Sequence, residues 1–366
     1  MKVSRIEPLA FRNLADAPVA VGSGLTVVHG PNGAGKTNLL EALFFALTGR
    51  SPRTKREREA IAFGAALARV EADLVPDPGE GVEPLTMLAS ISSGESRRRL
   101  VDGAPARGED DHRRPAISLF MPDRLALVKG PPSPRRAHLD RLAAALRPAR
   151  AELPRAYGRS LAQRNNLLAR VRRGGDPSSL EAWDRELAEC AAPLVESRAE
   201  AAAALTAPFA TAAGELGLAG GAQIEYRPRT GDLSVAAIIA ELATRREGDI
   251  ARGFTGYGPH RDEVELSFGG RSLRRYGSQG QQRVGLLALL FAEREALQQA
   301  RRQLPLMLLD DVMSELDPER RQLLVAMLES GGQALITATE AAHVPTSDAS
   351  ELAIADGIAV ATESIG

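Results

Sequence analysis

Cysteine and aromatic residues are scarce in this chain, and each scarcity argues against a class of protein. The single cysteine among 366 residues, Cys190, cannot form an internal disulfide, so we expect a reducing compartment. Aromatic residues make up only 4%, which argues against a platform that stacks single-stranded bases. A net charge of −1 excludes a uniformly basic protein. Binding to nucleic acid would therefore depend on local basic patches.

Long apolar runs are also missing. No stretch reaches membrane-spanning length and no signal peptide opens the sequence, so we expect a cytoplasmic protein without a membrane partner. Hydrophobic residues at 44% and charged residues at 25% are ordinary for a globular protein, and the length predicts two or three domains with a large core.

One strong motif stands between a short apolar run, residues 25–28, and a helical pattern that begins at Lys36. A strand, Gly-x-x-x-x-Gly-Lys-Thr and a helix are typical of a P-loop, in which backbone N–H groups and the helix N-terminus surround a polyphosphate. Lys36 is one of only four lysines, which makes a chance glycine-rich helix cap a weak alternative. We expect Lys36 to contact the β/γ-phosphates of a nucleoside triphosphate and Thr37 to coordinate Mg²⁺. The predicted nucleotide-binding residues are Gly30, Pro31, Asn32, Gly33, Ala34, Gly35, Lys36 and Thr37.

A second apolar run, residues 306–309, ends in two carboxylates, Asp310 and Asp311. A carboxylate at the end of a buried strand can hold Mg²⁺, and the next one can orient or deprotonate the attacking water. Apolar strands that end in Asp are common, so this pair is informative only because a P-loop is present. We assign Asp310 to the metal and Asp311 to catalysis.

The stretch Ser278, Gln279, Gly280 and Gln281 opens a predicted helix shortly before that strand. Ser278 with Gln281 matches a capping box, which is a purely structural interpretation. The free N-terminus of the helix is also a ready anion site. A single P-loop does not need a second helix N-terminus to bind phosphate. In two chains packed head to tail, however, the helix N-terminus of each chain could contact the phosphate bound by the other chain.

Together, these motifs resemble an ABC ATPase. Residues 30–37 are similar to Walker A, Ser278–Gln281 to the signature, residues 306–311 to Walker B and residues 314–317 to the D-loop, in the ABC order. The chain resembles the SMC-like branch and, within it, the RecF family most closely. Further likeness, spread over nearly the whole chain, lies in residues 11–14, 135–140, 163–165 and 258–262.

The resemblance implies a weak, DNA-dependent ATPase that uses ATP and Mg²⁺ and forms an ATP-dependent homodimer. It implies binding to double-stranded and gapped DNA at single/double-strand junctions, with RecO and RecR as partners in loading a recombinase. It also implies catalytic roles for Lys36, Asp311 and Ser278. Two features depart from the ABC pattern: Asp311 stands where Glu is usual, and residues 336–339 lack the expected switch histidine. His260 is more plausibly structural than catalytic.

The strand and helix patterns divide the chain into residues 1–132, 133–253 and 254–366. The outer segments predict an α/β ABC-type ATPase head with a mostly parallel sheet and an antiparallel N-terminal sheet, and the middle segment predicts an inserted α-helical domain. We expect its helices to be of moderate length, with a capping box formed by Ser178 and Glu181.

Arginines gather in two stretches of the first segment. One is a charged loop after the P-loop helix, and the other leads into Asp102-Gly103, a hairpin signal, so that its first and third arginines share a strand face. Both are candidates for contacts with a phosphate backbone, although charged loops are usually only solvated. Arg164 and nearby arginines of the helical segment have the same two interpretations. The candidate DNA contacts are Arg53, Lys55, Arg56, Arg97, Arg98 and Arg99.

A transporter-type ABC ATPase subunit is the alternative function. It would carry a short helical insert, whereas about 240 residues separate the P-loop from the signature here. A P-loop kinase or GTPase would not need Ser278–Gln281, and no guanine-reading Asn-Lys-x-Asp occurs in the chain.

Overall fold

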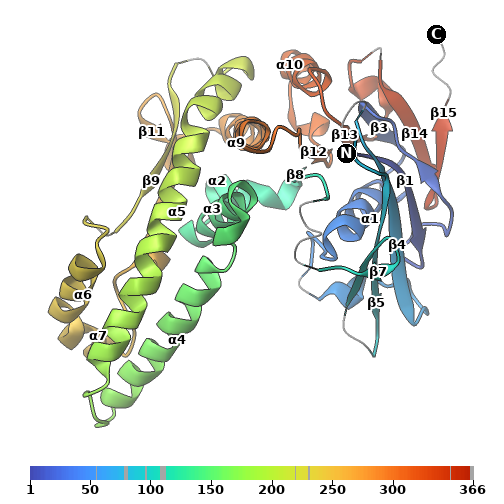
Figure 1. Ribbon diagram of the computed structural model, residues 1–366. Helices are drawn as coiled ribbons and strands as arrows, with labels where there is room; N and C mark the ends of the chain where they lie inside the picture. Colours follow the sequence, from blue (N-terminus) through green and yellow to red (C-terminus); the bar gives the residue numbers. More distant parts are fainter. Residues whose placement is uncertain are drawn as a thin grey trace. The chain divides into compact units, whose positions relative to one another are not determined.

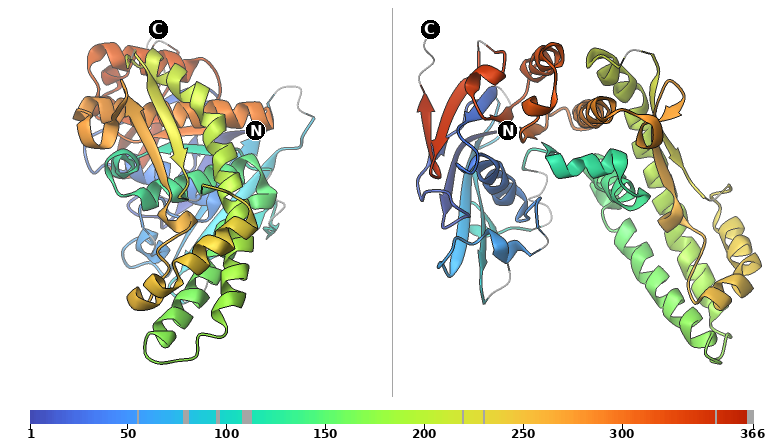
Figure 2. Two further views of the ribbon diagram at one scale, coloured as in Figure 1. Left: turned by 90° about the vertical axis from the view of Figure 1, so that its left-hand side faces the viewer. Right: turned by 180° about the vertical axis from the view of Figure 1, so that it is seen from behind.

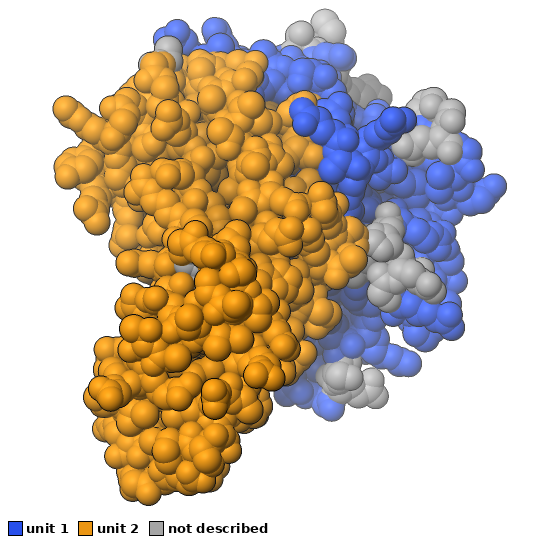
Figure 3. All heavy atoms as spheres, turned by 60° about the vertical axis from the view of Figure 1, so that its left-hand side comes forward, with its two compact units in different colours: residues 1–123, 297–366 blue, residues 124–296 orange. Residues whose placement is uncertain are grey.

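The computed structural model describes residues 1–54, 56–77, 81–94, 97–107, 113–218, 220–229, 231–346 and 348–362. The chain forms two compact units, coloured separately in Figure 3. Unit 1 combines residues 1–123 with 297–366, and unit 2 is the continuous stretch 124–296. The early and late parts of the sequence therefore share one unit.

Unit 1 contains two six-stranded sheets (Figure 1). One is antiparallel, in the order β2-β1-β4-β5-β6-β7; the other has the order β15-β14-β3-β13-β12-β8 and is parallel except at its β15 edge. The predicted parallel and antiparallel sheets are both confirmed. The strands are β1 (Lys2–Leu9), β2 (Val19–Ala20), β3 (Leu25–His29), β4 (Leu67–Val75), β5 (Leu85–Ser92), β6 (Arg98–Val101), β7 (Ala104–Pro105), β8 (Ile117–Phe120), β12 (Leu306–Leu309), β13 (Ala334–Ala338), β14 (Ser350–Ala355) and β15 (Ile358–Thr362).

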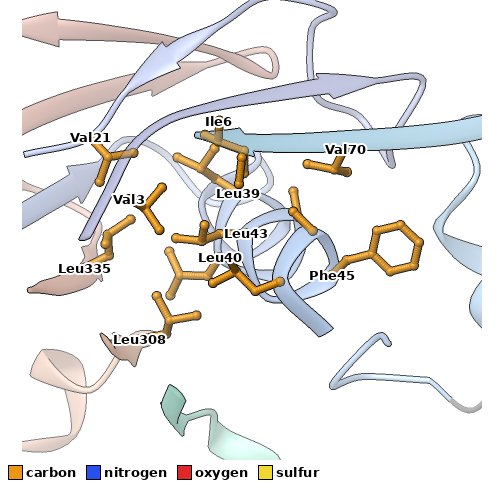
Figure 4. Close-up of a cluster of buried hydrophobic side chains, with 14 of the residues drawn as sticks. Val3, Ile6, Val21, Leu39, Leu40, Leu43, Phe45, Val70, Leu308 and Leu335 are labelled. Atoms are coloured by element: carbon orange, nitrogen blue, oxygen red, sulfur yellow. The ribbon is translucent and has the colours of Figure 1, made fainter. Parts of the chain in front are cut away.

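Helix α1 (Lys36–Thr48) lies in the core of unit 1. Its apolar residues recur at helical spacing, and Leu39, Leu40 and Leu43 are at most 1% exposed. Figure 4 shows them among side chains of the antiparallel sheet, such as Ile6, and of the parallel sheet, such as Leu308. The helix ends at Gly49, whose φ of 68° is a backbone conformation that glycine adopts without strain. Both sheets thus fix the helix that begins at the P-loop.

The side chain of Gln333 ties the antiparallel sheet to the parallel one. Its amide oxygen accepts from the Val3 N–H at 2.8 Å, and its amide nitrogen donates to the carbonyls of Val3 at 2.6 Å and Gly22 at 2.7 Å. Val3 belongs to β1, and Gln333 directly precedes β13. Because Gln333 is only 4% exposed, water cannot replace these bonds.

The helical segments of unit 1 besides α1 are short. Helix α10 begins as predicted, with Asp317 as its N-cap accepting from the Arg320 N–H at 3.0 Å and Pro318 in its first turn. The segments within unit 1 are η1 (Glu57–Ala60), η6 (Met313–Glu315), α10 (Pro318–Glu329) and η7 (Ala341–His343). Two further helices cross the boundaries between the units: η3 (Pro122–Leu125) and α9 (Gln279–Arg301).

Unit 2 is mainly helical and contains a three-stranded antiparallel sheet of order β11-β10-β9. Pairing of β9 with β10 joins residues 254–296 to the helical segment, whereas the sequence assigned those residues to the ATPase head. The elements are α2 (Ala126–Lys129), α3 (Pro132–Leu146), η4 (Pro148–Arg150), α4 (Leu153–Val171), α5 (Leu180–Glu215), β9 (Ala222–Arg227), α6 (Val235–Thr244), α7 (Arg246–Arg252), η5 (Pro259–Arg261), β10 (Glu263–Phe268), β11 (Arg271–Ser272), α8 (Leu273–Tyr276) and the start of α9.

Helix α5 has 36 residues, so the expectation of moderate helix lengths is wrong. It packs along α4 as a helical hairpin, visible in both views of Figure 2. The predicted capping box is also wrong, because Ser178 bonds the Asp176 carboxylate and α5 begins after Ser179 without a side-chain cap. Despite its length, neither α5 nor any other described helix carries an apolar stretch sufficient to cross a bilayer.

Arg164 is fully buried and does not belong to a basic face. Its guanidinium donates to Asp184 at 2.7 Å, to Asp249 at 2.9 Å and to the Thr255 hydroxyl at 2.8 Å. Removing one partner of such a buried pair leaves an uncompensated charge, which is strongly destabilising. The cluster joins α4, α5 and α7 in unit 2.

Gln333→Ala removes all three hydrogen bonds of the side chain and leaves a buried N–H and a buried carbonyl of Val3 unpaired. We expect the free energy of unfolding, measured in a denaturant titration, to fall by about 2–4 kcal/mol. Gln322→Ala, on the exposed face of α10, is the control. A loss below about 0.5 kcal/mol at Gln333 would show that the bridge between the sheets contributes little.

Candidate nucleotide-binding site

The P-loop turns sharply between β3 and α1, and glycine is required at two of its positions. A Cβ on Gly30, where φ is 153°, would lie 2.1 Å from the carbonyl oxygen of Ile354. Gly35 caps α1 with φ 117°, and a Cβ there would meet Ile354 and Leu14 at 3.2 Å. The backbone can therefore follow this path only with glycine at these two positions. In a P-loop, such a turn allows backbone N–H groups to point towards a phosphate.

Lys36 is 8% exposed, and its ammonium group is held by the loop itself. The Nζ atom donates to the carbonyls of Gly30 at 2.7 Å and Pro31 at 2.9 Å. These bonds keep a positive charge at the mouth of the loop, where it can attract a phosphate. The remaining loop residues predicted to bind nucleotide, Asn32, Gly33 and Ala34, lie in the same turn.

Walker A and Walker B meet at the carboxyl ends of parallel strands. The Thr37 hydroxyl lies 2.8 and 3.0 Å from the two carboxylate oxygens of Asp310, which directly follows β12. The Thr337 hydroxyl, on β13, donates to Oδ1 of the same carboxylate at 2.9 Å. The structure thus brings together Thr37 and Asp310, the two residues predicted to hold the metal, and adds Thr337.

Burial raises the pKa of the Asp310 carboxyl, because a 5% exposed carboxylate has lost most of its hydration. The neighbouring Asp311 carboxylate raises that pKa further, whereas the two hydroxyl hydrogen bonds and Arg53 lower it. A magnesium ion would favour the ionised form in the same way as other positive charge. Hydroxyl and carboxylate oxygens are the hard ligands that Mg²⁺ prefers, so Thr37 and Asp310 fit this ion.

Asp311 has an uncommon backbone conformation, with φ at +48°. Its N–H donates to the Thr337 hydroxyl at 2.8 Å, and its carbonyl accepts from the Ser314 hydroxyl at 2.9 Å. Ser314 belongs to the predicted D-loop, and Arg321 donates to the carbonyls of Met313 and Leu316 in the same segment. The turn that carries the predicted catalytic carboxylate is therefore held on both sides.

A buried carboxylate on α1 was not recognised in the sequence. Glu41 is fully buried and accepts two hydrogen bonds from Arg12, at 3.0 and 2.8 Å, and others from Ser51 and Arg53 at 2.6 and 3.1 Å. Arg53 also donates to the Asn38 side chain at 2.8 Å. A glutamate on the otherwise apolar face of a helix was the available signal, since a buried charge needs partners.

The signature residues lie in unit 2, at the start of α9. The Ser278 N–H donates to the Gln281 side chain at 2.9 Å, and the Gln281 N–H donates to the Ser278 hydroxyl oxygen at 3.2 Å. The capping-box interpretation is thereby confirmed. The cap uses the hydroxyl oxygen as an acceptor, so its hydrogen can still be donated to a ligand.

His260 has a structural environment, as expected. Its Nδ1 shares a 2.7 Å hydrogen bond with the Tyr157 hydroxyl, and its Nε2 lies 3.0 Å from the carbonyl oxygen of Thr255. Burial lowers the pKa of the imidazole, which favours its neutral form.

The candidate DNA contacts have different surroundings. Arg97 and Arg99 both pass close to Gly49, but Arg97 lies just before β6, so only Arg98 and Arg99 of the three arginines lie on the strand. Arg97 pairs with Glu57 at 3.3 Å. Arg56 and Arg98 are exposed, whereas Arg53 is bound to Glu41. Lys55 lies outside the described residues.

Comparison with known proteins agrees with this geometry. Residues 6–79 match a family model described as an AAA domain. A solved Smc head bound to the C-winged helix domain of ScpA shares the fold, with a TM-score of 0.61 at 15% identity over 100% of this chain and 98% of that one. Fold and site together define an ATPase head of the SMC-like ABC class.

More similar proteins identify the family. The DNA replication and repair protein RecF of Myxococcus xanthus (strain DK1622) is 39% identical over 349 residues, which cover 91% of this chain and 90% of the relative. RecF of Deinococcus radiodurans is 36% identical, with coverages of 93% and 91%. A solved structure of the recombination mediator protein RecF-ATP in the RecFOR pathway has a TM-score of 0.86 at 26% identity and covers 99% of this chain and 98% of that one. The chain belongs to the RecF family.

Lys36→Ala removes the ammonium group at the mouth of the P-loop and only two hydrogen bonds to the backbone. We expect ATP affinity, measured by calorimetry, to fall at least tenfold while the thermal unfolding midpoint stays within a few degrees. The exposed Lys129 of unit 2 offers a matched Lys129→Ala control. Unchanged affinity in Lys36→Ala would refute the site assignment.

Proposed function

We propose that this protein is an ATP-dependent DNA-binding protein of recombinational repair and replication-fork maintenance. The observation that carries the proposal is the meeting of Thr37 and Asp310 at one end of the parallel sheet, beside the P-loop of a RecF-family chain. A phosphate-binding loop and a carboxylate–hydroxyl pair at one place are the parts that hydrolysis of a nucleoside triphosphate requires.

In this proposal each site residue has one role. The backbone N–H groups of residues 32–37 and the Lys36 ammonium bind the phosphates of ATP, and Thr37 with Asp310 holds Mg²⁺. The ion would neutralise phosphate charge. Asp311 orients the attacking water and accepts its proton, and its short side chain accounts for slow hydrolysis that resets the protein.

In this proposal, the signature residues bind the γ-phosphate of an ATP molecule held by a second chain. The cap of Ser278 with Gln281 leaves the hydroxyl hydrogen and the N-terminus of a 23-residue helix available for an anion. Two chains in head-to-tail contact would place each Ser278 at the γ-phosphate held by the other. ATP would thereby close a homodimeric clamp on DNA.

The substitution Ser278→Arg tests whether Ser278 only caps its own helix or also belongs to a catalytic site shared between two chains. We expect each chain to bind ATP, whereas ATP-dependent dimerisation, followed by light scattering, and ATP hydrolysis fail together because arginine blocks closure. Ser234→Arg is the matched control: Ser234 caps α6 with the same 3.2 Å bond to a backbone N–H, so the cost in stability, about 1 kcal/mol, should be similar.

A mixture of Ser278→Arg with Lys36→Ala chains tests the head-to-tail arrangement further. In a mixed dimer, one composite site would contain both substitutions and the other composite site would contain neither. Partial recovery of hydrolysis would therefore support a catalytic site formed by two chains. Normal ATP-dependent dimerisation by Ser278→Arg alone would refute this mechanism.

We propose that DNA is bound through its phosphate backbone, because arginines are plentiful and aromatic residues few. The preferred forms would be duplex and gapped DNA with single/double-strand junctions. The partners would be RecO and RecR, since similar RecF structures are described within the RecFOR pathway. Stimulation of hydrolysis by DNA and a cytoplasmic location belong to the same proposal. The similarity to RecF proteins does not favour a transporter subunit.

Arg56→Ala combined with Arg98→Ala removes two exposed cations of unit 1. We expect weaker binding to gapped DNA and a salt dependence of log affinity less steep by about one per lost phosphate contact. Arg185→Ala with Arg229→Ala, exposed in unit 2, provides the control. An unchanged salt slope in the Arg56/Arg98 variant would place the DNA contacts elsewhere.

A further inference from the structure

Thr337 connects the Asp310 carboxylate to the backbone of Asp311 through one buried hydroxyl. The residue is fully buried in β13, beside β12, which Asp310 directly follows. Its hydroxyl donates to Asp310 Oδ1 at 2.9 Å and accepts from the Asp311 N–H at 2.8 Å. A hydroxyl can do both at once, whereas the methyl group of a valine can do neither.

Both bonds restrain groups that would otherwise be free to move. The first orients the Asp310 carboxylate, which two hydroxyls now contact, one from α1 and one from β13. The second fixes the peptide that leads into Asp311, where φ is +48°. A non-glycine residue in this left-handed region is strained, so it persists where its surroundings hold it.

We propose that Thr337 is a positioning residue for ATP hydrolysis. It fixes the Asp310 carboxylate for Mg²⁺ and the start of the Asp311 turn for the attacking water, and it lies in the segment that lacks a switch histidine. This inference rests on the proposed function in requiring Mg²⁺ and ATP at the P-loop. The Mg²⁺ dependence of ATP binding tests it without DNA or dimerisation, whereas kcat tests it in the ATP-bound dimer. Partners that orient metal ligands in this way are typically worth 10–100-fold in metal affinity or activity.

The chain supplies a matched control in Thr26. This threonine is also fully buried in the parallel sheet, in β3, where it is paired with Leu335 of β13. Its hydroxyl has no hydrogen-bond partner among the described residues. Thr26→Val and Thr337→Val therefore make the same chemical change in one sheet, and only the second removes bonds to Walker B.

The experiment measures ATP affinity by calorimetry, first in EDTA and then across a Mg²⁺ titration, together with kcat, KM and thermal unfolding. For Thr337→Val we expect affinity in EDTA within twofold of the parent protein. The Mg²⁺ concentration for half-maximal effect should rise, or kcat should fall, by 10–100-fold. Thr337→Ser, which keeps the hydroxyl, should recover most of the loss, and Thr26→Val should keep the Mg²⁺ dependence and kcat of the parent.

The inference is overturned if Thr337→Val keeps the Mg²⁺ dependence and kcat of the parent, or if Thr26→Val loses as much. If Thr337→Val does not fold, Thr337→Cys replaces it, with a thiol that is a weaker donor and acceptor, and is judged by the same limits. Absence of ATP binding by the parent protein would refute the proposed function as well, which distinguishes the two failures.

Discussion

Burial of α1 between two sheets is the constraint on which the candidate nucleotide site depends. Leu39, Leu40 and Leu43 contribute to one continuous hydrophobic core with residues of both sheets. Because α1 starts at Lys36, packing that fixes the helix axis also fixes the position of the P-loop and of Thr37. The Gln333 bridge supports this arrangement at a point where hydrophobic packing alone would not define how β1 meets β13.

Parallel strand pairing provides the second half of the site. Strands β12 and β13 lie side by side and in parallel, so Asp310 and Thr337 emerge at the same edge of the sheet. Parallel pairing of β13 with β3 brings the P-loop to that edge as well. A carboxylate buried there would be costly unless hydroxyls or a cation compensated it, and the two threonine hydroxyls contribute that compensation.

Polar interactions also organise unit 2. Arg164 links three helices through two buried aspartates, and Arg198 donates to both carboxylate oxygens of Asp140 and to the carbonyl of Pro259. Buried groups of this kind define which helices pack together, because a shifted register would leave charges unpaired. Helix α9, which begins with the signature residues, starts within this unit.

The sequence alone determined the motifs whose chemistry is local. Glycine spacing before Lys36, the apolar run before Asp310 and the Ser278–Gln281 cap depend on neighbours within a few residues, so their patterns predicted the structure correctly. Only the tertiary structure decided which distant groups meet. Thr337, Glu41 and Arg164 look like an ordinary strand threonine, a helix glutamate and a surface arginine, since a sequence does not show which side chains lose water. Folding gave them their partners by placing separate strands and helices side by side, where buried charges and hydroxyls must pair.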